Sequence, residues 1–430
     1  MSDDRAFQKQ FFRALTDEPI TDPNDEWYVR LYDDPAFAPL DPVEQLWNAI
    51  DYTRGSSIHL LSGYRGTGKT TELYRLAAKL PKDQYKVVHV FMENYLNMAT
   101  PVDVSDFLLA VACAFGEGLH AHHLLDRDPR EETGWSWIRN FFKTADIQIP
   151  ELSVVGIKTY LKSELSFRNK IHERMGQHLD TLVASVRAFV QECAQALRKR
   201  WGQDTEFVLL VGSIEHLHGT YLNGKEVQDS VSTLFGIHAE KLAIPYLHIV
   251  YTVPPYLSVL SPGAGQGCNA QAVHVFPAVK VHERDRQSFS PGIRALRQLL
   301  KKRGDWQRLF KTKEQLDYVI RMSGGNIRGL FRMVRQIILV TKTLPVSDET
   351  IELALNQLRM EFLPIANDEA RWLAVIAKTH TASLCDYAQV SQFANLIQRQ
   401  LIHYQLANPI WYDVHPLVRG QILAPPDEWN

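Results

Sequence analysis

The stretch Gly63-Tyr64-Arg65-Gly66-Thr67-Gly68-Lys69-Thr70 decides the fold of this chain, because it matches the phosphate-binding pattern G-x-x-x-x-G-K-[ST]. An apolar run at 57–61 precedes it and predicts a buried strand, and residues 71–80 carry apolar side chains at helical spacing. A glycine loop between a strand and a helix directs backbone N–H groups and the helix N-terminus at one point, which suits a polyphosphate. The sequence therefore predicts a P-loop.

The residue types in this loop suggest a role for each part. Gly63, Gly66 and Gly68 allow the backbone to curl without a Cβ in the way. The expected ligand is ATP or ADP. We expect Lys69 to reach the β-phosphate and, in ATP, the γ-phosphate, and the Thr70 hydroxyl to bind Mg²⁺. The predicted nucleotide-binding residues are Gly63, Tyr64, Arg65, Gly66, Thr67, Gly68, Lys69, Thr70 and Thr71.

The composition is that of an ordinary globular chain. It has 430 residues, 45% hydrophobic and 22% charged, which is long enough for two or three domains. The net charge of −2 gives no overall attraction to nucleic acid or to membranes. Four widely spaced cysteines without a C-x-x-C pair fit a reducing cytosol. No uncharged stretch approaches the ~20 residues of a membrane helix, so we expect a cytoplasmic protein with no membrane partner.

Four regions are predicted along the chain. They are an acidic, proline-dotted arm at 1–40, a P-loop core at 41–285 with a helical insertion at about 120–205, a helical lid at 286–365 and a winged-helix-like domain at 366–430. Strands and helices alternate at the start of the core, which predicts an α/β fold with a parallel sheet. An insertion of this size usually contacts a partner or another subunit.

Further elements of the core follow from periodicity. Strands are predicted at 86–92, 206–211, 244–254 and 273–281, and helices at 41–50, 103–119 and 169–201. Partial alternation at 145–165 suggests a hairpin. The helix at 41–50, with Asp41 as N-cap and Pro42 at its first position, either borders an adenine pocket or simply packs on the core.

Residues 292–342 are helical and basic. Thirteen cations face only three acids, namely Arg294, Arg297, Lys301, Lys302, Arg303, Arg308, Lys311, Lys313, Arg321, Arg328, Arg332, Arg335 and Lys342 against Asp305, Glu314 and Asp317. This excess either meets phosphates of a nucleotide or nucleic acid, or is a solvated face covered by the acidic arm. Within it, Gly324-Gly325-Asn326-Ile327-Arg328 predicts a lid that presses a cation onto bound phosphate.

The C-terminal region predicts helices at 368–378 and 390–403 and a hairpin of strands at 401–405 and 409–414. This order suggests a winged helix. Its charges are close to balance, and residues 392–405 hold one arginine. A helix that reads DNA is usually more basic, so packing or switching is the favoured role.

This order of motifs resembles the AAA+ ATPases of the origin-recognition type and the related STAND signalling ATPases, which include the NACHT and NB-ARC proteins. The resemblance implies an ASCE/AAA+-like P-loop NTPase fold, with Thr252 as the first sensor and Arg328 as the second. It also implies a Mg²⁺-binding aspartate where this chain has Gly212. Glu215, in the same loop, and Glu93, which ends the strand after the P-loop helix, are the acids expected to substitute.

The resemblance also implies a function. STAND proteins hold ADP while closed, exchange it for ATP, then oligomerise and switch on an effector. No nuclease, protease or NADase constellation is visible here, so we expect an ATP-binding switch with slow or uncertain hydrolysis, in a homo- or hetero-oligomer. Its effector or protein partner would be another chain, as in bacterial anti-phage systems. The alternatives are a DNA-dependent AAA+ loader, which the basic lid favours, and a metabolic kinase, which the lid and winged helix oppose.

Overall fold

The computed structural model describes residues 2–125, 154–163, 178–220, 222–264, 273–382, 388–405 and 411–423. The chain divides into two compact units, each built from segments that are distant in sequence. The lid unit consists of Met1–Pro42, Gly63–Arg75 and Phe276–Asn430, and the sheet unit of Val43–Ser62 and Leu76–Val275. The P-loop therefore belongs to the same compact unit as the predicted lid.

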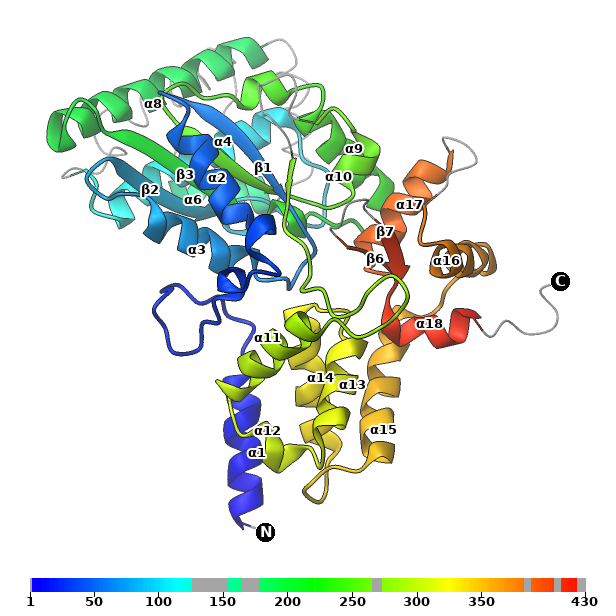
Figure 1. Cartoon of the computed structure of the whole chain (residues 1–430). Helices are drawn as coiled ribbons and strands as arrows, with labels where there is room; N and C mark the ends of the chain where they lie inside the picture. Colours follow the sequence, from blue (N-terminus) through cyan, green and yellow to red (C-terminus); the bar gives the residue numbers. More distant parts are fainter. Residues whose placement is uncertain are drawn as a thin grey trace. The chain divides into compact units, whose positions relative to one another are not determined.

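A five-stranded sheet forms the centre of the sheet unit (Figure 1). In spatial order its strands are β2 (Tyr85–Phe91), β3 (Glu206–Gly212), β4 (His248–Val253), β1 (Ser57–Ser62) and β5 (Val273–Val275). Every pairing is parallel, so the carboxyl ends of the strands share one edge. The predicted fold class, an α/β P-loop NTPase core with a parallel sheet, is confirmed.

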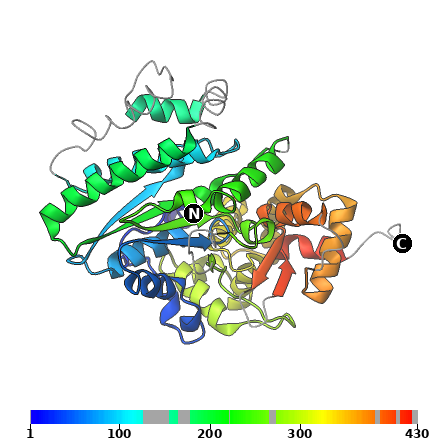
Figure 2. The same ribbon diagram turned by 90° about the horizontal axis from the view of Figure 1, so that it is seen from above.

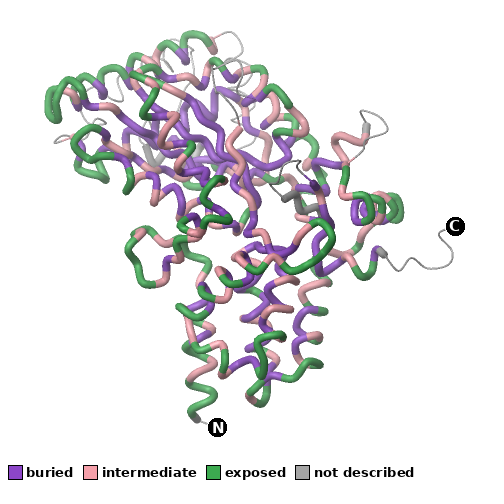
Figure 3. The backbone as a smooth tube through the Cα atoms, in the orientation of Figure 1, coloured by how far each residue is buried: buried purple, intermediate pink, exposed green. Residues whose placement is uncertain are grey.

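The central strands are buried on both faces, as their apolar sequences require. Every residue of β4 is buried, and β3 is buried from Phe207 to Gly212. These strands lie among the buried parts of the sheet unit (Figure 3). The carboxyl edge of the sheet is thus a rigid base for the loops that follow each strand.

Helices cover both faces of the sheet (Figures 1 and 2). On one face α4 (Val104–Ala121) packs on β2, and α6 (Val154–Ser163) and α8 (Leu179–Trp201) pack on α4. On the other lies α2 (Pro42–Asp51). The shorter elements of this unit are η3 (Met92–Asn94), η4 (Ile214–His216), α9 (Gly224–Phe235), η5 (Ala239–Leu242) and α10 (Leu257–Leu260).

The helix α4 has the length and hydropathy of a membrane span, but 83% of that stretch is buried inside the structure. It begins after Asp103, whose carboxylate accepts the Ser105 amide at 2.8 Å. Most of its residues are buried, as is typical of a helix in the core of a globular protein.

The lid unit is built mainly from helices. They are α1 (Ser2–Ala14), α3 (Lys69–Lys79, whose last turn lies in the sheet unit), α11 (Ser290–Lys301), α12 (Trp306–Leu309), α13 (Lys313–Met322), α14 (Ile327–Val340) and α15 (Asp348–Arg359). Helix α11 packs on α13, α13 on α14 and α14 on α15, and α1 packs on α14. The first helix of the N-terminal arm therefore packs on the basic lid. Short 3-10 turns complete the unit: η1 (Leu31–Asp33), η2 (Ala38–Leu40) and η7 (Met360–Phe362).

The C-terminal part of the lid unit has the predicted order of two helices and a hairpin. Its elements are α16 (Asn367–Thr379), α17 (Ala388–Gln398), β6 (Ile402–Gln405), β7 (Trp411–Val414) and α18 (Pro416–Leu423). The two strands are antiparallel, and α16 packs on both β7 and α18. The predicted connection at 406–408 lies outside the described residues.

The hairpin predicted at 145–165 is wrong for the part that the structure describes, because 154–163 is the helix α6. Its buried side chains Ile157 and Leu161 are four residues apart, which places them on one helical face. The rest of the predicted hairpin, and residues 169–177 of the predicted long helix, lie outside the described residues.

The strand predicted at 273–281 ends at Val275. Its partner β1 pairs with it only from Leu60 to Ser62, after which the chain enters the P-loop and offers no further strand. The residues that follow bond to the lid instead: Val279 donates its amide to the Gly325 carbonyl at 3.1 Å. A Cβ at Gly325 would lie 1.7 Å from the Val279 oxygen, so this contact requires glycine there.

Candidate nucleotide-binding site

The P-loop backbone adopts conformations that its glycines permit. Gly66 has φ +84° and Gly68 has φ +103°, both in the left-handed region. At Gly63 a Cβ would lie 2.5 Å from the Phe276 carbonyl oxygen. The three glycines predicted to shape the loop are thus each placed where a side chain would be strained or would collide.

The Lys69 side chain lies within the loop rather than in solvent. Its ammonium group donates to the carbonyls of Gly63 at 2.9 Å and Tyr64 at 2.8 Å, and the residue is 4% exposed. The Thr67 hydroxyl donates to the same Tyr64 carbonyl at 2.9 Å. A fixed cation surrounded by a loop whose backbone curls around it suits the charge and shape of a phosphate group.

Polar contacts with the N-terminal arm hold α3 behind the loop. Glu72 is buried and accepts the Tyr28 hydroxyl at 2.8 Å and Arg75 Nε at 2.5 Å. Arg75 also forms a bidentate pair with Asp41, at 2.8 and 2.5 Å. Burial raises the pKa of Glu72, and the Arg75 charge opposes that shift. The Thr71 hydroxyl accepts the Ile20 amide at 3.1 Å, so this predicted nucleotide residue contacts the arm.

The lid bonds directly to the P-loop through the N-terminus of α14. The Arg328 amide donates to the Gly66 carbonyl at 3.0 Å, and Asn326 Nδ2 donates to the Arg65 carbonyl at 2.7 Å. Asn326 is also the N-cap of α14, because its Oδ1 accepts the Gly329 amide at 2.9 Å. Asn326 belongs to the lid motif at 324–328 but is not among the predicted site residues; an asparagine directly before a helix is the signal in the sequence for this cap.

The Arg328 side chain lines a cavity of about 320 Å³ within the lid unit. Arg65, Arg332 and His415 line the same cavity. The Arg328 guanidinium is 34% exposed and lies 3.9 Å from the Asp17 carboxylate. The structure thus places Arg328 beside the P-loop, with an acidic side chain of the arm as its partner.

In the sheet unit, Glu215 and Thr252 are in direct contact at the carboxyl edge of the sheet. The Thr252 hydroxyl, at the end of β4, donates to Glu215 at 2.5 Å and also reaches the Val211 carbonyl at 3.3 Å. Two residues predicted separately, one as an acid and one as a sensor, are therefore hydrogen-bonded to each other.

The position of the expected Mg²⁺ aspartate lies tightly against an aromatic ring. A Cβ at Gly212, the last residue of β3, would lie 3.1 Å from Phe91 Cδ1 and 3.6 Å from His89 Nε2. The His89 and Phe91 rings lie 4.6 Å apart. Burial lowers the pKa of His89 to about 4. An aspartate at 212 would need the Phe91 ring to shift by a few tenths of an ångström, so glycine is the residue that fits there without adjustment.

Glu93 contacts a different side chain. Its carboxylate lies 2.9 Å from His216 Nδ1 and is 47% exposed. His216 directly follows Glu215, so the two predicted acids belong to neighbouring turns, η3 and η4. Over the described ranges, no group of three or more His, Cys, Asp or Glu side chains could hold a metal ion. Among the predicted residues, Thr70 on the first turn of α3 fits Mg²⁺ that is brought by phosphates.

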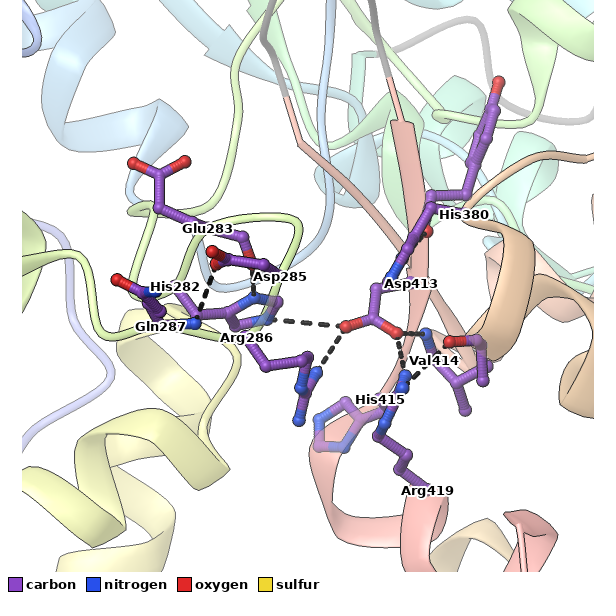
Figure 4. Close-up of polar contacts among 12 residues, drawn as sticks. His282, Glu283, Asp285, Arg286, Gln287, His380, Asp413, Val414, His415 and Arg419 are labelled. Carbon is purple, nitrogen blue, oxygen red and sulfur yellow. Dashed lines mark hydrogen bonds and ion pairs between the residues drawn. The ribbon is translucent and has the colours of Figure 1, made fainter.

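A second polar cluster, in the C-terminal part of the lid unit, surrounds Asp413 (Figure 4). The Asp413 side chain is 1% exposed and is bound by Arg286 on one oxygen and by Arg419 on the other. His282 Nε2 lies 3.5 Å from it, and the Val414 amide donates to it at 2.8 Å. The cluster joins the segment after the core to β7 and α18. Sequence reasoning missed it, because its members are far apart in the chain.

A glycine loop and helix at the end of β1, within a parallel sheet, define a P-loop NTPase fold. No protein-family model and no curated protein matches this sequence. Among solved structures, the chain is similar to a Walker-type ATPase of Pyrococcus abyssi, at 11% identity and TM-score 0.45, covering 96% of this chain and 100% of that one.

The chain is also similar to the Aeropyrum pernix ORC2 protein solved as ADPNP–ADP complexes, at 11% identity and TM-score 0.39, covering 92% of this chain and 95% of that one. The Aeropyrum pernix ORC1 protein in complex with DNA matches at 13% identity and TM-score 0.36, covering 93% and 96%.

Proposed function

We propose that this chain binds ATP or ADP with Mg²⁺ in its P-loop and acts as a nucleotide switch of the AAA+/STAND type. The observation that carries the proposal is the pair of bonds from the lid to the loop, Arg328 to Gly66 and Asn326 to Arg65. A ligand that changes the conformation of the loop would also change the geometry of these two hydrogen bonds and so the position of the lid. The lid therefore has a direct way to distinguish one bound nucleotide from another.

The chain's own residues supply the binding chemistry. Backbone N–H groups of the loop and the first turn of α3 would hold the phosphates, with Lys69 as the cation and Thr70 as the Mg²⁺ ligand. The bound metal would draw together the phosphate oxygens and neutralise their charge. Arg328 would exchange its distant partner Asp17, at 3.9 Å, for phosphate.

We infer slow hydrolysis or none. The acid that usually fixes the metal is replaced by Gly212, and the Phe91 ring occupies the neighbouring space. Glu215 is held by Thr252, and Glu93 contacts His216. These carboxylates are the remaining candidates for a catalytic acid or base, but neither stands at the position of the replaced aspartate.

The readout would pass along packed lid helices to the C-terminal helices and hairpin, which we interpret as a winged helix. Helix α14 packs on α15, and α15 packs on α18. Arg359, at the end of α15, donates to the Leu417 carbonyl at 2.5 Å. A shift of α14 would thus reach α18. The partner that reads this shift would be an effector on another chain, in a homo- or hetero-oligomer, with anti-phage defence as the proposed setting.

Nucleotide affinity in Lys69→Ala tests the proposal. Wild-type protein should bind a fluorescent ATP analogue and ADP, and Lys69→Ala should not. Lys82→Ala, an exposed lysine outside the loop, is the matched control and should bind as wild type. Unchanged affinity in Lys69→Ala would remove the basis of the proposal. Turnover should stay far below the ~1 s⁻¹ of ordinary ATPases.

Arg328→Ala tests the sensing role separately. Loss of this cation should reduce the preference between ATP and ADP, since the two ligands differ in the phosphate that it would reach. An unchanged ratio of affinities would clear Arg328 of that role.

A DNA-dependent AAA+ ATPase of the loader type is the second candidate. The excess of cations at 292–342 favours it. Acidic side chains of the arm neutralise part of that excess: Arg308 pairs with Asp3 and Asp4, and Arg294 lies 3.6 Å from Asp34. Brisk ATP turnover stimulated by duplex DNA would favour this candidate over the switch.

A further inference from the structure

The arm and α11 line a basic, open cavity of about 910 Å³ within the lid unit. Five cations line it, Lys9, Arg13, Lys301, Lys302 and Arg303, against the acids Glu26 and Asp305. A second cavity, of about 390 Å³, is lined by Arg30, Arg294, Arg297 and again Lys301, against Asp34. Because Lys301 lines both, the two cavities adjoin across its side chain. We call the pair the α11 groove.

Several cations of the α11 groove are already engaged. Arg297 pairs with Asp317 at 2.5 Å, and Lys302 donates to the backbone carbonyls of Glu26 at 2.6 Å and Tyr28 at 2.9 Å. The Lys302 bonds fix the arm against α11, and the Arg297 pair joins α11 to α13, so both help to build the walls of the groove. The acceptors of Lys302 are neutral carbonyl groups, so these hydrogen bonds do not neutralise its charge.

Four further cations of the α11 groove are exposed and have no ion-pair or hydrogen-bond partner among the described residues: Lys9, Arg13, Arg30 and Lys301. They come from α1, from the loop before η1 and from α11, so residues distant in sequence place like charges around one groove. Like charges repel, and such an arrangement is stabilised when an anion lies between them.

Aromatic rings line the α11 groove beside these cations. Trp27 lines the larger cavity and Trp306 the smaller. The Arg303 guanidinium lies 5.7 Å from the Trp27 ring centroid and 4.7 Å from that of Phe331, and donates to the Trp27 carbonyl at 3.1 Å. Burial lowers the pKa of Arg303 to about 10. The wall of the larger cavity therefore includes the Arg303 guanidinium beside the indole of Trp27.

We propose that the α11 groove binds the backbone of a single-stranded nucleic acid. Cations spaced along a concave surface with aromatic rings between them are the features that hold unpaired strands, whose phosphates and base faces are both accessible. An acidic peptide would use the cations but has no need of the two indoles. This inference goes beyond nucleotide binding and rests on residues that the P-loop proposal does not use.

The test is a binding isotherm of the full chain with a fluorescein-labelled 20-nucleotide single strand, by anisotropy, across a salt series. Four phosphate contacts predict a slope of log K against log salt of about −2.8, or about 50-fold weaker binding at 200 mM than at 50 mM salt. The variant carries four substitutions, Lys9→Ala, Arg13→Ala, Arg30→Ala and Lys301→Ala. It should lose this affinity and most of the slope.

The matched control removes four exposed lysines outside the groove, with Lys82→Ala, Lys311→Ala, Lys313→Ala and Lys342→Ala, and should bind as wild type. Equal binding by the two variants would overturn the proposal. Equal competition by polyglutamate would assign the groove to an acidic peptide instead, and equal binding of a duplex would exclude a single-strand site. Lys69→Ala should still bind the strand, so failure of the groove and failure of the P-loop are separate results.

Discussion

Replacing Gly66 by alanine should loosen the lid from the P-loop. The new Cβ would lie 2.5 Å from Arg328 Cβ and 2.7 Å from Asn326 Oδ1. The substitution therefore opposes the two bonds that these lid residues make to the loop. Gly55→Ala is the matched control, because Gly55 has the same φ of +84° with nothing within 4 Å of its added Cβ.

The magnitude has two parts. Holding alanine in the left-handed region costs about 1–2 kcal/mol in both variants. Only Gly66→Ala also weakens two hydrogen bonds, from Arg328 and Asn326, each contributing about 0.5–1.5 kcal/mol. The difference between the variants is therefore about 1–3 kcal/mol, which corresponds to roughly 5- to 150-fold in a local opening equilibrium.

Hydrogen exchange followed by mass spectrometry measures that equilibrium without requiring the chain to unfold in one step. A peptide spanning 326–333 contains the Arg328 and Gly329 amides, which are both bonded in the structure. Without nucleotide, these amides should exchange roughly 5- to 150-fold faster in Gly66→Ala than in wild type, and at the wild-type rate in Gly55→Ala. Equal exchange in all three proteins would refute the inferred coupling of lid and loop.

Three other changes test separate parts of the structure. Gly212→Asp should destabilise the sheet unit by about 1–3 kcal/mol in urea because its Cβ would lie 3.1 Å from Phe91 Cδ1, and it should cost less when introduced into a Phe91→Ala background. Burial lowers the folded-state pKa of His59 to about 3. As the pH falls from 6.5 toward 3, only the unfolded state takes up a proton on this histidine, so the free energy of unfolding falls by up to about 1.4 kcal/mol per pH unit. His59→Gln should therefore flatten the slope of unfolding free energy against pH. Asp413→Asn should leave Arg419 without its anion and cost about 3 kcal/mol, seen as faster hydrogen exchange in α18, whereas normal protection would show that the pair is dispensable.

The parts of the site that could be predicted from sequence are those whose physics is local. The loop at 63–70 needs glycines, a lysine and a helix start within a few residues, and all of these are visible in the pattern. The lid helix α14 has a strong apolar face and an asparagine cap directly before it. Its start was therefore predictable, although its bond to Gly66 was not, because that bond joins residues on opposite sides of the core in the sequence.

The errors have a different origin. The strand predicted at 273–281 was too long because strand length depends on the partner, and β1 ends at Ser62. The hairpin predicted at 145–165 followed a partial alternation and, in the described part 154–163, overlooked Ile157 and Leu161 at helical spacing. The contact of Phe91 with Gly212 could not be predicted, because neighbours on adjacent strands depend on the strand register, and the local sequence does not determine that register.

The buried carboxylate of Asp413 limits the order in which this protein could have changed over time. It is shared by Arg286 and Arg419, with His282 nearby. Loss of either arginine first leaves the acid with another cation, which is tolerable. Loss of the acid first leaves two guanidinium groups facing each other without an anion. Relatives that lack the aspartate should therefore lack at least one of the arginines, and this pattern of paired replacement would be a record of the contact in their sequences.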